Sequence, residues 1–96
     1  MIKVNVHVLM SVKEVIGASK IALQIHDSAT LKELVDLLVD NYGEKFSDLV
    51  INPDTGEPYK YFRLVLNGRD IIFLNGMKTT LSDGDEFLII PPIGGG

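Results

Sequence analysis

The last six residues of the chain, Pro-Pro-Ile-Gly-Gly-Gly at positions 91–96, could present a reactive carboxylate to a partner. Pro91 and Pro92 cannot donate the hydrogen bonds of a β-ladder and hold φ near its extended value, so we expect strand pairing to stop before them. The glycines that follow have no Cβ and lose much backbone freedom on ordering, so they should not fold on themselves. The segment therefore predicts a flexible, extended arm that can enter a channel too narrow for side chains and present the α-carboxylate of Gly96. An unstructured end or a linker is the alternative.

A second chemical pattern is the triplet Asp54-Thr-Gly56, which matches the catalytic triplet of aspartic proteases. That chemistry needs hydrophobic flanks that bury a pair of carboxylates and separate their pKa values. Here Asn52-Pro53 precede the triplet and Glu57-Pro58 follow it. These polar and proline-containing flanks favour a solvated turn. They do not favour the active site of a protease in which each of two subunits supplies one triplet.

Metal binding and nucleophilic catalysis lack the residues that they need. The chain has no cysteine, which excludes disulfides, cysteine-ligated metal centres and a thiol nucleophile. His7 and His26 have no cysteine or third histidine to complete a ligand set, and we expect both at the surface, where His26 could hydrogen-bond Asp27. No serine lies in a G-x-S-x-G context and no glycine cluster opens a helix, so neither a serine hydrolase nor a phosphate-binding loop is indicated.

The composition indicates a single globular domain in the cytoplasm. The 96 residues are 46% hydrophobic and 23% charged, which suits one folded core. The opening residues alternate apolar and polar side chains, unlike a signal peptide, and no apolar run approaches about 18 residues, so we expect no membrane association. The net charge is −4 and the nine basic residues are scattered, so we expect no direct binding to nucleic acid.

The first half of the chain predicts a hairpin. Apolar and polar residues alternate over residues 2–9 and again over 20–26, which is typical of half-buried strands. The connection between them, residues 10–19, is expected to be a loop around Gly17.

One long amphipathic helix is predicted next. Thr30-Leu-Lys-Glu33 is a capping-box pattern, in which the threonine hydroxyl and the glutamate satisfy each other's backbone amides at the start of a helix. The apolar residues that follow fall on one stripe as far as Tyr42. Gly43 is placed to end the helix in the left-handed conformation.

The second half predicts short strands joined by turns. Residues 44–51 have room for another short turn of helix, and 52–58 are a loop. Residues 59–66 predict a strand closed by a type I′ turn at Asn67-Gly68. Residues 86–90 predict the final strand.

These elements predict an α+β fold of the β-grasp, ubiquitin-like kind, with a mixed sheet of four to five strands and one main helix on one face. The domain would span residues 1–90, and 91–96 would form an extended tail. If the first and last strands are neighbours at the centre of the sheet, as in that fold, the tail projects from a rigid element.

Three segments resemble the family of small ubiquitin-like sulfur carriers, which includes the small subunit of molybdopterin synthase, the thiamine-pathway sulfur carriers and the archaeal-type small modifiers. They are Val65–Gly76, the turn Leu81–Glu86 and the Pro-Pro-Ile-Gly-Gly-Gly end. The resemblance extends over essentially the whole chain.

The resemblance implies a mechanism in which partners do the chemistry. An E1-like activating enzyme would use ATP to adenylate the carboxylate of Gly96, and a persulfide sulfur donor would then convert it to a thiocarboxylate. The acceptor would be the large subunit of molybdopterin synthase or another sulfur acceptor enzyme. The chain itself would bind no cofactor or metal and have no turnover, although its tail could complete a partner's active site.

Carried over to this sequence, the family's functional residues lie at the chain end. Gly96 would be the reactive terminus and Gly95 its partner in the diglycine. The residues that guide the tail and contact the partner would be Gly94, Ile93, Pro92 and Pro91. Phe73 and Phe87 are candidates for a hydrophobic docking surface, although an aromatic residue at strand spacing is more often part of the core.

The resemblance leaves three classes of function open. Residues 44–60 resemble the longer form of archaeal-type members, some of which are conjugated to lysines or supply sulfur for tRNA thiolation. A sulfur carrier, most simply the molybdopterin synthase small subunit, is the first class and a ubiquitin-like modifier the second. A β-grasp adaptor that uses only its surface is the third.

Overall fold

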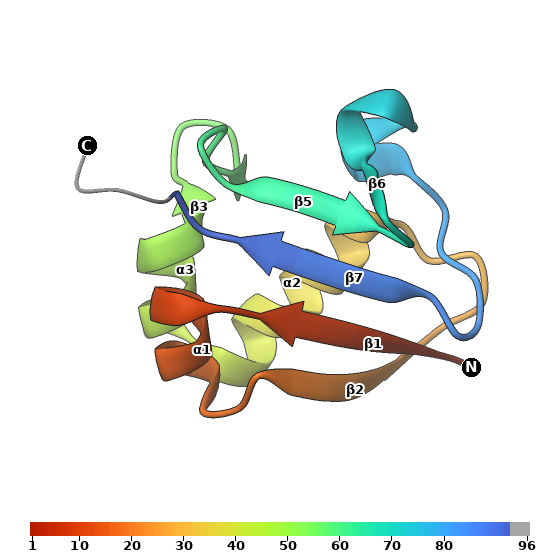
Figure 1. Cartoon of the computed structure of the whole chain (residues 1–96), viewed down its shortest axis with the longest axis horizontal. Helices are drawn as coiled ribbons and strands as arrows, with labels where there is room; N and C mark the ends of the chain where they lie inside the picture. Colours follow the sequence, from red (N-terminus) through yellow and green to blue (C-terminus); the bar gives the residue numbers. More distant parts are fainter. Residues whose placement is uncertain (93–96) are drawn as a thin grey trace.

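The first and last strands of the chain lie side by side at the centre of one sheet (Figure 1). A computed structural model describes residues 1–92 of the chain. Strand β1 (Ile2–Val8) runs parallel to β7 (Glu86–Ile90) and pairs with it in a register that places Val8 opposite Ile89. Within the described residues the sheet has five strands in the order β2-β1-β7-β5-β6, where β2 is Lys20–Ile25, β5 is Arg63–Leu66 and β6 is Arg69–Asp70. The predicted β-grasp fold and its central strand pair are confirmed.

The connection between β1 and β2 is a helix, so the predicted loop at residues 10–19 is wrong. Helix α1 (Met10–Ile16) buries Val12 and Ile16, which are four residues apart and therefore lie on one face. Leu9 precedes the helix and provides no side-chain cap, so the usual start signal is missing from the sequence. Gly17 ends the helix in the left-handed conformation, with φ of 86°.

Helix α2 (Leu31–Tyr42) begins at the predicted capping box. The Glu33 amide donates to the Thr30 hydroxyl at 3.3 Å, and the Thr30 amide donates to the Glu33 carboxylate at 3.2 Å. The buried face of the helix consists of apolar residues with at most 1% exposure: Leu31, Leu34, Val35 and Leu38.

Gly43 does not end α2 in the left-handed helical conformation. Its φ is positive, at 71°, but its ψ is −152°. The same glycine is the N-cap of the next helix, α3 (Glu44–Val50). The backbone therefore changes direction at this single residue, between the end of α2 and the start of α3. A positive φ at this junction still favours glycine.

The remaining elements are short. Strands β3 (Ile51–Asn52) and β4 (Glu57–Pro58) form a separate hairpin. The strand predicted over 59–66 is confined to β5, because Tyr59 donates its amide to Val50 at 2.8 Å and only Arg63 onward pairs with β7.

The predicted Asn67-Gly68 turn joins β5 to β6, with φ of 52° and 83°, both positive as a type I′ turn requires. Two 3₁₀ helices follow: η1 (Ile71–Phe73) and η2 (Gly76–Lys78).

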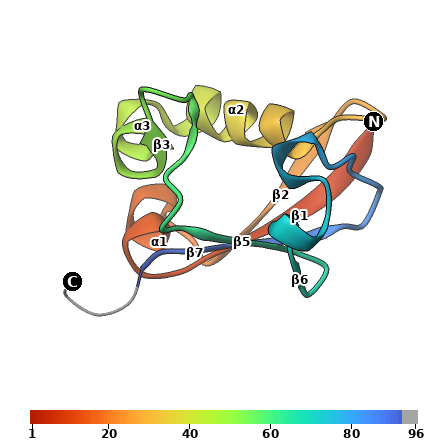
Figure 2. The same ribbon diagram turned by 90° about the horizontal axis from the view of Figure 1, so that it is seen from above.

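The helices within residues 1–92 cover one face of the sheet (Figure 2). The core lies between that face and the helices, and its largest fully buried side chains include Phe46 of α3 and Phe87 of β7. Burial of each large apolar side chain contributes about 1.5–3 kcal/mol. The opposite face carries the half-buried and exposed side chains of the strands, and no second layer from residues 1–92 covers it.

Candidate functional site

Strand β7 holds the C-terminal segment firmly at its base. The strand pairs with β1 on one side and β5 on the other, and Phe87 and Ile89 are 0% and 1% exposed. The strand ends at Ile90, where the sequence predicts that pairing stops. Pro91 is buried and Pro92 is exposed, so the chain reaches the surface at Pro92.

The predicted reactive residues follow directly from this point. Ile93, Gly94, Gly95 and Gly96 lie outside the described residues, and their roles stay predictions. Gly96 is the fourth residue after Pro92. A fully extended chain of that length reaches at most about 14 Å.

Phe87 cannot belong to a docking surface, which corrects one of the two predicted candidates. Its ring points into the core and is completely buried. Inward and outward positions alternate along β7, and the helices cover the face on which Phe87 lies.

Phe73, the other candidate, is 73% exposed and lies beside Ile72, which is 75% exposed. Both belong to η1, beyond the end of β5 that pairs Leu66 with Phe87. That end of the sheet is where β7 begins, whereas Pro92 follows the other end of β7. Strand β6, which leads directly into η1, lies at the end of the sheet opposite the end of β7 (Figure 1), so Phe73 is exposed but far from Pro92.

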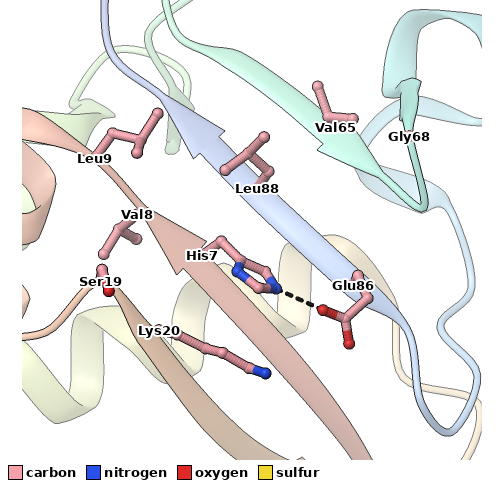
Figure 3. Close-up of a pocket in the computed structure, with 9 residues that line it drawn as sticks. All are labelled: His7, Val8, Leu9, Ser19, Lys20, Val65, Gly68, Glu86 and Leu88. Atoms are coloured by element: carbon pink, nitrogen blue, oxygen red, sulfur yellow. Dashed lines mark hydrogen bonds and ion pairs between the residues drawn. The ribbon is translucent and has the colours of Figure 1, made fainter.

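The uncovered face of the sheet carries a shallow pocket of about 560 Å³, which we call the sheet-face pocket (Figure 3). Its apolar part includes Leu9, Val65 and Leu88, and its polar part includes His7 and Glu86. The pocket spans β1, β7 and β5, the strands that hold the base of the tail. A partner that binds here would also lie close to that base.

Hydrogen bonds fix the polar part of the sheet-face pocket. The side-chain amide of Asn5 donates from Nδ2 to Glu86 Oε2 at 2.5 Å, and His7 Nε2 lies 2.5 Å from Glu86 Oε1. These two contacts, the Asn5 bond first, lower the pKa of Glu86. The carboxylate is therefore ionised at neutral pH, and it shares the pocket with the cationic side chain of Lys20, which also lines it.

The sequence contained a signal for the apolar part of this pocket. Residues 87–90 are Phe-Leu-Ile-Ile, a continuous apolar run and not an alternating one. Such a run places apolar side chains on both faces of a strand. Leu88 and Ile90 accordingly lie half-buried on the face that the helices do not cover.

A second concavity, the tail-root groove, adjoins the point where the chain reaches the surface. It has a volume of about 490 Å³ and is lined by Ser11, Leu49, Tyr61, Phe62, Pro91 and Pro92. It is formed by α1, α3 and the segment before β5, none of which the sequence linked to the tail.

The other sequence patterns lead to no site. Asp54 and Gly56 are exposed in the turn between β3 and β4, as expected for a solvated turn. His26 Nδ1 is 2.8 Å from the Asp27 carbonyl, the predicted local partner. Its Nε2 also contacts Glu33, which the sequence did not indicate, and the two contacts, Glu33 first, raise the pKa of His26.

Residues 1–92 carry neither a metal-binding cluster nor a membrane-spanning helix. No cluster of three or more histidine, cysteine, aspartate or glutamate side chains in this part of the chain could hold a metal ion. None of its helices has the length and apolar character required to cross a membrane.

The fold and the central position of β7 define a class of protein, the small ubiquitin-like β-grasp proteins, in which the last central strand leads into a glycine-rich end. Sequence comparison identifies the family within this class. The ThiS family model matches residues 6–96, and the chain belongs to this family of ubiquitin-like sulfur carriers and modifiers.

Some relatives of this chain are named as modifiers and others as sulfur carriers. The chain is 32% identical over 84 residues to "Small archaeal modifier protein 3" of Haloferax volcanii, with 88% of each chain covered. It is 29% identical over 68 residues to "Sulfur carrier protein CysO" of Mycobacterium tuberculosis, covering 70% of this chain and 72% of the relative.

The fold is also similar to that of a solved structure. The crystal structure of SAMP1 from Haloferax volcanii superposes with a TM-score of 0.85 and covers 98% of this chain and 99% of its own. The sequence identity in this comparison is 23%, so the likeness concerns the fold alone.

Proposed function

We propose that this protein is a cytoplasmic sulfur carrier whose terminal Gly96 carboxylate is adenylated and then converted to a thiocarboxylate. The observation that supports this most strongly is the family match, which extends to residue 96. The rigid attachment of β7 on both sides supplies the physical rationale. A tail that starts from a fixed point can be directed into a partner's channel.

The first chemical step is activation of a poor electrophile. A carboxylate oxygen of Gly96 attacks the α-phosphorus of ATP, and pyrophosphate leaves. The resulting acyl-adenylate has a good leaving group, AMP. Because the chain lacks a phosphate-binding loop, an E1-like partner supplies the ATP site and the catalytic groups.

The second step introduces sulfur. The terminal sulfur of a donor's persulfide attacks the acyl-adenylate, AMP leaves, and an acyl disulfide forms. A second thiol of the donor then reduces that disulfide, which releases the thiocarboxylate and leaves the donor oxidised. This chain has no cysteine, so the persulfide and the second thiol of the exchange both belong to partners.

The body of the protein contributes recognition and not catalysis. The sheet-face pocket presents an apolar area next to the ionised Glu86. It is built on the strands that hold the tail, so an enzyme docked there would have the tail within reach. We infer that the activating enzyme binds over this face.

The acceptor of the sulfur is the finer part of the proposal. We favour the role of molybdopterin synthase small subunit, in which the tail inserts into the large subunit and donates sulfur there. The alternative is a modifier conjugated to lysine amines, or a sulfur donor for tRNA thiolation. The modifier is supported by the 32% identity to a protein named as a small archaeal modifier.

Pyrophosphate exchange tests the activation step that both candidates share. The purified chain should stimulate ATP–pyrophosphate exchange by the activating enzyme of its host. Deletion of Gly95 and Gly96 should abolish the exchange, because the shortened tail loses about 7 Å of reach. Gly94→Ala keeps the terminal diglycine and should retain the exchange. Equal exchange with the deletion variant would refute the proposal.

A further inference from the structure

The tail-root groove lies where the tail leaves the folded body. Arg63 of β5 pairs with Ile90 of β7, so the residues just before Arg63 flank the prolines that follow Ile90. Tyr61 and Phe62 accordingly line one side of the groove next to Pro91 and Pro92. Leu49 of α3 and Ser11 of α1 complete the lining.

The chemistry of this groove favours an apolar occupant. No charged residue is among those that line it in the described part of the chain. Its polar groups are the hydroxyls of Ser11 and Tyr61, and its other walls are leucine, phenylalanine and proline. A charged side chain would be desolvated here without an ionic partner.

Tyr61 is exposed but held in place. Its side chain is 58% exposed, and its ring stacks on Tyr59 with centroids 5.0 Å apart and an interplanar angle of 8°. It also contacts Phe62, whose ring centroid is 5.3 Å away and whose side chain is 7% exposed. A ring that is already ordered loses little entropy when a partner covers it, and tyrosine is enriched among the residues that dominate binding energy.

The short tail brings any enzyme that acts on it close to this groove. The carboxylate of residue 96 can be no more than about 14 Å from Pro92. An active site that encloses the tail must therefore have its entrance near Pro92. The rim of that entrance would lie against the residues that line the tail-root groove.

We propose that the tail-root groove is a docking site for the activating enzyme, and that Tyr61 receives an apolar side chain from the rim of the enzyme's tail channel. This inference rests on the proposed function, since it assumes that an enzyme adenylates the tail. It adds a recognition element on the β5 side of the tail, separate from the sheet-face pocket. Phe62 and Tyr59 position the Tyr61 ring.

The test compares Tyr61→Ala with Tyr61→Phe and Ile72→Ala. The variants are assayed by pyrophosphate exchange with the host's activating enzyme at saturating ATP, with the concentration of the carrier varied. Loss of one interface aromatic should raise the KM for the carrier about tenfold, and kcat should stay unchanged. Tyr61→Phe keeps the ring and should behave as the wild type. Ile72 is also an exposed apolar residue, at 75% against 58% for Tyr61, but it lies at the other end of the sheet, so Ile72→Ala should also have the wild-type KM.

Three results would overturn the inference, each in a different way. A KM for Tyr61→Ala within twofold of wild type, while wild-type exchange is robust, refutes the docking site and leaves the proposed function intact. An absence of exchange with the wild-type chain refutes both. Thermal unfolding of each variant shows whether a changed KM reflects lost structure; a lower kcat together with a lower melting temperature would also contradict a docking role.

Discussion

The sequence left two roles open for Phe87, a core residue or part of a docking surface, and the substitution Phe87→Ala distinguishes them. Phe87 is fully buried between the sheet and the helices, so Phe87→Ala removes a large side chain and leaves a cavity. Such substitutions cost about 3–5 kcal/mol. A domain of this length has a total free energy of unfolding of about 5–14 kcal/mol. The variant should therefore lose between about a fifth and all of its free energy of unfolding.

Urea unfolding measures this loss directly. With a slope of about 2 kcal/mol per molar urea, a loss of about 4 kcal/mol lowers the midpoint by about 2 M. The signal can be far-ultraviolet circular dichroism, since the chain has no tryptophan. Phe73→Ala is the matched control, because its ring is 73% exposed and its loss should change stability by no more than about 0.5 kcal/mol. A Phe87→Ala variant that loses less than about 1 kcal/mol would refute its assignment to the core.

Three further predictions concern local features. Thr30→Ala removes the hydroxyl that accepts from the Glu33 amide and should cost about 1 kcal/mol of stability in urea unfolding; no change would show that the capping box contributes nothing. Met10 has φ of 52°, so Met10→Gly should relieve strain and stabilise the protein by about 1 kcal/mol; a lower midpoint would contradict this. The contact between His26 and Glu33 raises the pKa of His26 above 6.5, so its stabilising effect is complete below that value and disappears as pH rises through the folded-state pKa. The stability difference between wild type and His26→Asn should thus be larger near about pH 5.5 than near about pH 8.5, and a pH-independent difference would count against the contact.

The two helices α1 and α2 show when a helix can be predicted from its local sequence and when it cannot. The capping box and apolar stripe of α2 specify its start and its buried face, and the structure confirms both. Helix α1 has no capping side chain and only two buried residues, Val12 and Ile16, so its pattern is too short to distinguish from a loop. Its burial becomes clear only once the sheet and α3 are in place.

The strands show which parts depend on long-range contacts. The run 87–90 predicts a strand, but it cannot show which face the helices will cover, and so the burial of Phe87 was ambiguous. Residues 59–62 have strand-like composition, yet they cross from the hairpin β3–β4 toward the sheet, and Tyr59 bonds Val50 instead of β7. The tail-root groove arises from three segments far apart in sequence, which no local pattern connects.

The intact mass of the protein tests the proposed sulfur chemistry most directly. The chain is incubated with ATP, a sulfur source and an extract of its own host, and its mass is compared with that of the variant lacking Gly95 and Gly96. That variant still ends in a glycine carboxylate, at Gly94, but its tail is shorter. The full chain should gain the mass that replaces one oxygen by sulfur, and the variant should not. An unchanged mass of the full chain in an active extract, or an equal gain in the variant, would contradict the proposed carrier function.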